Sequence, residues 1–106
     1  MKKILIGTSI FLASLTTPAF ADWHGGTVKL LGVAYDGSTI AFQLVGWSRN
    51  NCTCYAPWPD SMCLNRSRAS FKEEVAMLYS ARARGTALHA NIDENTCQVI
   101  ALYEND

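Results

Sequence analysis

Residues 70–103 read SFKEEVAMLYSARARGTALHANIDENTCQVIALY, and they predict one helix followed by two strands. Ser70 and Glu73 match the capping box, in which a serine and a glutamate satisfy each other's free amides at a helix start. Gly85 predicts the helix end, because glycine accepts the left-handed conformation that often closes a helix. One apolar stripe recurs at helical spacing and predicts the face that packs on the core: Phe71, Val75, Leu78 and Tyr79.

The two predicted strands after the helix cover 86–92 and 96–103, with Asp93-Glu94-Asn95 between them as a hairpin turn. A second hairpin is predicted upstream, because the β-rich stretches 27–35 and 38–46 flank Asp36-Gly37, a strong two-residue turn signal. A short additional strand is predicted at 62–65. The chain is therefore expected to be mainly β with a single helix.

The predicted order is strand, strand, short strand, helix, strand, strand. A helix inserted between strands 3 and 4 of five is the order of the OB-fold, a small and partly open barrel. We therefore expect residues 22–106 to form a single domain of this type, a five-stranded OB-like barrel.

The first 21 residues have the pattern of a cleaved signal peptide. Lys2 and Lys3 precede an apolar stretch, 4–15, that is too short to span a bilayer core of about 30 Å. Ala19-Phe20-Ala21 offers the small residues that a signal peptidase requires, so cleavage is expected before Asp22. The alternative is an uncleaved membrane anchor, but it needs a longer apolar stretch. We predict an exported protein, periplasmic or extracellular, with no membrane span after cleavage.

The charge of the chain argues against a nucleic-acid partner, and its small size predicts covalent cross-links. Removal of the leader takes away two of the nine Lys and Arg residues and leaves nine Asp and Glu residues, so the exported chain is mildly acidic. Its basic residues are scattered, whereas nucleic-acid binding requires a clustered basic surface, so we expect no nucleic-acid partner. At this size a hydrophobic core alone leaves little net stability, so covalent cross-links are expected.

Four cysteines supply those cross-links: Cys52, Cys54, Cys63 and Cys97. An even number in a small exported domain predicts two disulfides. A direct Cys52–Cys54 bond is disfavoured because its ring is too small for disulfide geometry. Two pairings remain open, and the favoured one joins Cys54 with Cys63 and Cys52 with Cys97. The alternatives are a four-sulfur zinc site and a redox pair, but both prefer other spacings, so no metal and no cofactor is predicted.

A family resemblance lies in the same C-terminal third of the chain. The helix start SFKE at 70–73, Tyr79 followed by Ser80, and the exit GTALH at 85–89 resemble the B subunits of subtilase-cytotoxin and typhoid-toxin type. The layout is also similar to that of short secreted bacterial proteins. The resemblance implies an OB-fold and sugar binding. This chain is shorter than those subunits and has a Cys-x-Cys loop that they lack, and none of their sugar-contacting residues matches a position here.

The loop 47–63 contains the candidate binding residues. Aromatic rings that stack on sugars, beside amide and guanidinium groups that form hydrogen bonds, would make a platform for a glycan or a protein. The candidates are Trp47, Arg49, Asn50, Tyr55 and Trp58. The alternative is that Trp47 and Trp58 cover the end of the small barrel. His89 is interpreted as a surface or half-buried strand residue.

No arrangement of nucleophile, base and carboxylate is evident, so we expect no enzymatic activity and no catalytic residue. The sequence favours a small exported binding domain for a glycan or a protein partner. The alternative function is a structural or assembly subunit of a homo-oligomer that binds no small molecule.

Overall fold

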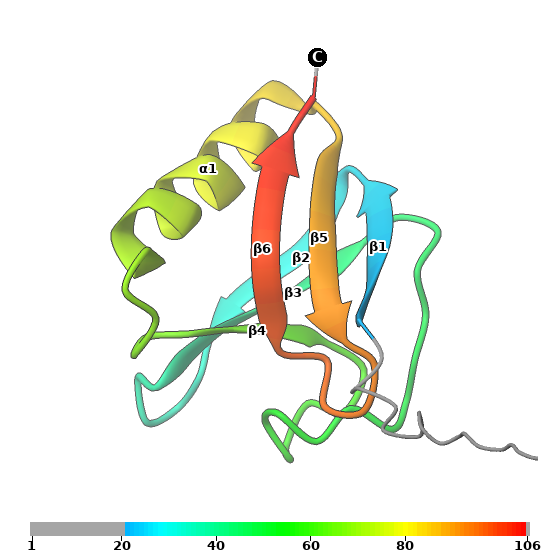
Figure 1. The fold of residues 1–106 in the computed structure, drawn as a ribbon, viewed down its shortest axis with the longest axis vertical. Helices are drawn as coiled ribbons and strands as arrows, with labels where there is room; N and C mark the ends of the chain where they lie inside the picture. The colour runs from blue at the N-terminus through cyan, green and yellow to red at the C-terminus, as the bar shows by residue number, and fades with distance from the viewer. Residues whose placement is uncertain (1–20, 106) are drawn as a thin grey trace, which may run out of the picture.

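The computed structural model describes residues 21–105, which form six strands and one helix (Figure 1). Except for Ala21, the predicted leader lies outside these residues. The mainly β composition and the single helix are as predicted for the described part of the chain. In chain order the elements are β1 (Ala21–Gly26), β2 (Val28–Val33), β3 (Thr39–Leu44), β4 (Met62–Asn65), α1 (Phe71–Arg84), β5 (Leu88–Asp93) and β6 (Val99–Glu104).

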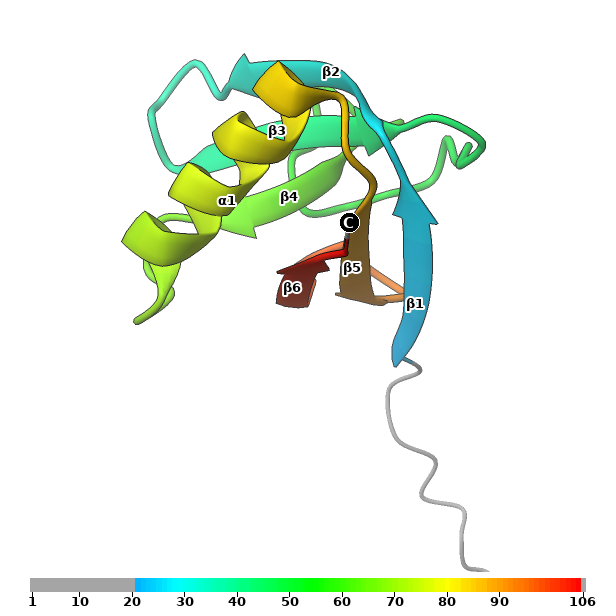
Figure 2. The same cartoon turned by 90° about the horizontal axis from the view of Figure 1, so that it is seen from above.

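The strands pair as two antiparallel sheets of three, in the orders β1-β5-β6 and β2-β3-β4. Figure 2 shows β2, β3 and β4 grouped apart from β1, β5 and β6. Strands β1 and β2 are separated by Thr27 alone, so this part of the chain passes directly from one sheet to the other. Between β4 and the last hairpin the described strand pairing is limited to an isolated parallel bridge, Cys63 with Gln98.

The prediction of a single five-stranded OB-like barrel with its helix between strands 3 and 4 is wrong. The structure has six strands in two sheets, and the helix follows the fourth strand. The missed strand is β1, whose sequence ADWHGG contains an aspartate and two glycines, residues that are depleted in strands. It forms because all six of its residues pair with β5, a contact with the distant end of the chain.

The hairpin of β2 and β3 is present, but its turn is longer than the predicted two residues. The Ala34 amide donates to the Thr39 carbonyl at 2.9 Å, which leaves four residues, 35–38, in the turn. Within it the carboxylate of Asp36 accepts hydrogen bonds from the backbone amide and the hydroxyl of Ser38, at 3.0 and 2.6 Å. Gly37 has a φ of 74°, the left-handed conformation that glycine tolerates best.

The helix ends as predicted and begins differently. Gly85 has a φ of 68°, and its amide and that of Thr86 donate to the carbonyls of Arg82 and Ala81, which is a Schellman motif. At the other end Ser70 precedes the helix but makes no side-chain capping bond, so the predicted capping box is not formed.

The first turn of the helix is held instead by an ion pair between Arg68 and Glu74. Arg68 donates through Nε and Nη2 to both carboxylate oxygens of Glu74, at 2.7 and 2.8 Å. It also donates to the carbonyls of Val99 and Ile100, which attaches the helix start to β6. The Glu74 carboxylate raises the pKa of Arg68 further above its ordinary value. The pair therefore positions the helix start where a capping box was expected.

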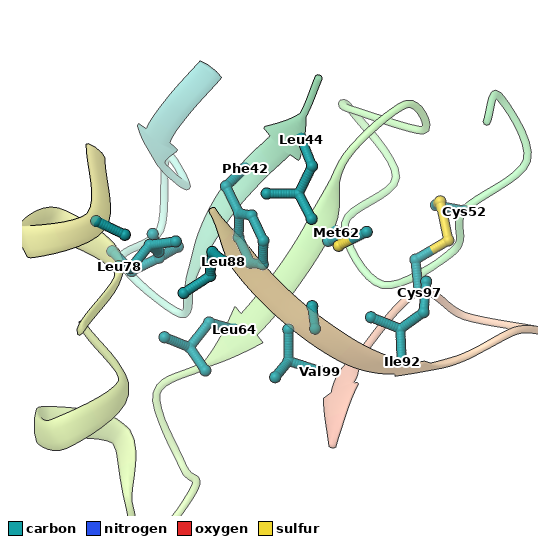
Figure 3. Close-up of a cluster of buried hydrophobic side chains, with 13 residues drawn as sticks. Phe42, Leu44, Cys52, Met62, Leu64, Leu78, Leu88, Ile92, Cys97 and Val99 are labelled. Atoms are coloured by element: carbon teal, nitrogen blue, oxygen red, sulfur yellow. A yellow bond between two sulfur atoms is a disulfide. The ribbon is translucent and has the colours of Figure 1, made fainter. Parts of the chain in front are cut away.

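The core lies between the two sheets and the helix (Figure 3). Leu78 is fully buried, and Phe71 and Val75 pack against the core from partly exposed positions. Tyr79 is 45% exposed, so its predicted place on the apolar stripe is wrong, and Ala81 is buried instead. The central cluster comes from both sheets and the helix: Phe42, Leu44, Met62, Leu64, Leu78, Leu88, Ile92 and Val99.

Two disulfides join Cys52 to Cys97 and Cys54 to Cys63, the pairing that the sequence favoured. The first attaches the long loop to the turn before β6, and the second closes the loop upon β4. All four cysteines are engaged, so none is free for the alternative zinc site. The disulfides indicate an oxidising, non-cytoplasmic environment. Within the described part of the chain, the helix is neither long nor apolar enough to cross a membrane.

Candidate functional site

The five candidate residues of the long loop fall into two groups that contact different parts of the molecule. Trp47, Arg49 and Asn50 belong to the first half of the loop, which runs toward the β5–β6 turn. Tyr55 and Trp58 belong to the second half, which lies against the sheet of β2, β3 and β4. The structure therefore gives this loop two separate roles.

The first group is an attachment point. Arg49 donates to the side chain and the carbonyl of Glu94 at 2.9 and 2.6 Å, and to the Asn51 side chain at 2.9 Å. Glu94 also pairs with Nε2 of His24 at 2.8 Å. Trp47 packs against the core from a partly buried position. These contacts join the loop to β1 and to the β5–β6 turn, while Asn50 is exposed beside them.

The second group forms a cleft on the outer face of the β2-β3-β4 sheet. The ring of Trp58 lies over Gly32, where a Cβ would be 3.3 Å from the Cη2 and Cζ3 atoms of the indole. Tyr55 packs edge-on against Trp58 with ring centroids 5.2 Å apart, and its hydroxyl accepts from the Tyr35 amide at 3.0 Å. The cleft has a volume of about 360 Å³ and is lined by Leu30, Leu31, Gly32, Gln43, Trp58, Asp60 and Ser61.

A second aromatic group, not identified from the sequence, lies on the outer face of the other sheet. Tyr103 of β6 stacks on His89 of β5, with centroids 4.6 Å apart and an interplanar angle of 14°. Trp23 of β1 meets the same tyrosine edge-on at 5.1 Å. Trp23 and Tyr103 are 46% and 44% exposed, and His89 is half-buried. We call Trp23, His89 and Tyr103 the aromatic triad.

The backbone beneath the triad helps to fix it. Gly25 is the cross-strand partner of His89, and a Cβ at position 25 would lie 2.5 Å from Nδ1 of that imidazole. Asn91 is the cross-strand partner of Trp23, and its buried Oδ1 has no hydrogen-bond partner among the described residues. Alternation along 86–92 indicates that His89 faces outward, but Trp23 could not be placed beside it because β1 was not predicted.

A third depression lies at the helix start and is basic. It has a volume of about 520 Å³ and is lined by Arg66, Arg68, Ala69, Phe71, Lys72 and Glu73. Its two arginines are engaged, because Arg68 binds Glu74 and Arg66 binds the Gly37 carbonyl while its guanidinium lies 5.0 Å from the centre of the Phe71 ring. These contacts give the two arginines a structural role.

Among the described residues no group of three or more His, Cys, Asp or Glu side chains is placed to hold a metal ion. The geometry instead offers two surfaces with aromatic rings, one on the outer face of each sheet: the rings of Tyr55 and Trp58 are partly buried, whereas Trp23 and Tyr103 are exposed. Comparison of the chain with protein-family models, with curated proteins and with solved structures found no match.

Proposed function

We propose that the protein is an exported, non-enzymatic binding domain that holds a glycan on the aromatic triad. The observation that carries this proposal is the exposed, mutually packed arrangement of Trp23, His89 and Tyr103 on the outer face of one sheet. Three strands contribute one ring each, so the surface is positioned by rigid elements rather than by a loop.

The chemistry of the triad suits a sugar. Exposed ring faces bury the apolar C–H surface of a pyranose, and the indole N–H, phenol O–H and imidazole nitrogens lie at the edges of the same rings, where hydroxyl groups require hydrogen bonds. No ionised carboxylate, ammonium or guanidinium group belongs to the triad, which favours a neutral ligand.

Exposure argues against a purely structural role for these rings. Core residues of this protein such as Leu78 and Leu88 are fully buried, whereas Trp23 and Tyr103 leave nearly half of their surface in solvent. Contiguous exposed apolar surface of this kind usually marks a binding site. The resemblance of residues 70–89 to sugar-binding toxin B subunits favours the same class of ligand. Such a domain would act in the periplasm or outside the cell.

A glycan array probed with the oxidised protein tests the proposal, and matched tyrosines supply the control. Tyr103 and Tyr79 are 44% and 45% exposed, but only Tyr103 belongs to the triad. Tyr103→Ala should weaken binding to the array ligand about fivefold or more, the usual effect at a binding residue that matters. Tyr79→Ala should leave binding unchanged, and both variants should keep the melting temperature of the parent within a few degrees.

Two results would count against the proposal. One is an equal loss of binding in both variants, since the triad would then have no special part. The other is an array without any ligand, combined with a mass in solution that is a multiple of the monomer, which would favour an assembly subunit.

A further inference from the structure

The cleft beside Trp58 lies on the other sheet and is independent of the triad. Seven residues line it, and Asp60 is the one among them that carries a charge. Its volume of about 360 Å³ is near the lower end of the range for ligand pockets, which suits one side chain better than an oligosaccharide. Leu30 is 42% exposed and forms part of its apolar wall.

The Trp58 ring is held in place before any ligand arrives. The amide of Trp58 donates to the Tyr55 carbonyl at 3.0 Å, and the Ser61 amide donates to the Trp58 carbonyl at 3.3 Å. The Cys54–Cys63 disulfide closes this segment, and flanking prolines at 57 and 59 restrict its φ angles. A ligand that contacts the indole therefore loses little binding energy to ordering of the loop.

The polar groups of the cleft include two side-chain acceptors, one of them charged. One N–H of the Gln43 side-chain amide donates to the Asp60 carbonyl at 3.1 Å, and the Oε1 of the same amide is an acceptor. The Asp60 carboxylate is exposed, and its nearest described partner is the Ser61 hydroxyl at 3.5 Å. A carboxylate, an amide oxygen and an indole ring thus occupy one small cleft.

We infer that this cleft binds a cationic side chain, best an arginine, on an exposed segment of a protein partner. A guanidinium group has five donors and no acceptor, so it can donate to both the Asp60 carboxylate and the Gln43 Oε1. It binds a carboxylate through charge-assisted hydrogen bonds and stacks on an aromatic face. The aliphatic part of the side chain contacts Leu30 and Leu31.

The test uses small probes and the oxidised full chain. N-acetyl-arginine amide is titrated while the indole N–H signal of Trp58 is followed by NMR, and N-acetyl-citrulline amide, which has nearly the same shape without the charge, is titrated in parallel. The arginine probe should shift the Trp58 signal and bind about fivefold more tightly than the citrulline probe, as expected for one partly exposed ion pair.

Variants identify the groups responsible. Asp60→Asn should remove the preference for arginine over citrulline, whereas Glu73→Gln, which neutralises an exposed carboxylate outside the cleft, should retain it. Trp58→Phe keeps a ring at the same place and should weaken binding of both probes without unfolding the protein.

Equal binding of the two probes, or a preference for arginine that survives Asp60→Asn, would overturn the inference. A Trp58 signal that moves with the array glycan and not with arginine would also overturn it, because the cleft would then bind sugar. Failure at this cleft leaves the triad untouched, since Tyr103→Ala reports on the other sheet.

Discussion

The two disulfides should differ in their contributions to stability, and the loops that they close set the difference. A cross-link stabilises a protein chiefly by reducing the conformational entropy of the unfolded chain, and this effect grows with the logarithm of loop length. The sequence separation is 45 for Cys52–Cys97 and 9 for Cys54–Cys63. The chain-entropy relation then assigns about 4.0 kcal/mol to the first and about 2.6 kcal/mol to the second.

Burial acts in the same direction as loop length. Cys52 and Cys97 are 3% and 0% exposed and belong to the core, whereas Cys54 is only partly buried. Replacement of the first pair by alanine therefore also removes more packed sulfur. We expect the Cys52→Ala, Cys97→Ala protein to lose at least about 1.4 kcal/mol more free energy of unfolding than the Cys54→Ala, Cys63→Ala protein.

Urea denaturation followed by tryptophan fluorescence measures both losses. The m-value should rise in each variant, because an unfolded chain that lacks a cross-link exposes more surface. Equal losses, or a larger loss for the Cys54–Cys63 pair, would refute the reasoning. Stability would then depend on how the short loop positions β4 and Trp58, and loop-closure entropy would be a minor contribution.

Three further predictions concern the helix, the turn between β2 and β3, and the leader. Leu78→Ala should lower the free energy of unfolding by about 2–5 kcal/mol. The loss should be larger than for Phe71→Ala, because Leu78 is fully buried and Phe71 is not. Urea denaturation of the two variants measures the difference. Hydrogen bonds from the side chain and amide of Ser38 hold the pKa of Asp36 below its ordinary value of 3.8. The resulting stabilisation is present above that value and is lost as the pH falls through the lowered pKa, and Ser38→Ala should raise the pKa in an NMR titration. Intact-mass analysis of the exported protein should show Asp22 as its first residue, and a retained leader would contradict the signal-peptide prediction.

Local sequence signals were sufficient where a structure depends on neighbouring residues. The β2–β3 hairpin follows from Asp36-Gly37 between two β-rich stretches, and the helix end follows from Gly85, since both depend on backbone conformations that glycine adopts at little cost. The cysteine count and the strained ring of a Cys52–Cys54 bond narrowed the pairing to two possibilities, of which the favoured one is present.

The carboxylate that is paired at the helix start could not be predicted from the neighbouring residues. Ser70 and Glu73 fit a capping pattern, yet the residue that is buried and paired is Glu74, because Arg68 approaches from the preceding loop and also binds carbonyls of β6. That choice depends on how β6 lies beside the helix, which no local pattern reveals.

By itself the sequence determined the helix, both hairpins and the need for two disulfides, because each of these rests on composition or on residues close in the chain. Only the tertiary structure decided the two-sheet arrangement and the aromatic triad. Strand β1 has little intrinsic tendency to be extended and forms by pairing with β5, which brings Trp23 beside His89 and Tyr103. The triad joins residues from opposite ends of the chain, so its existence depends on strand pairing over long sequence distances, and periodicity within a segment carries no information about that pairing.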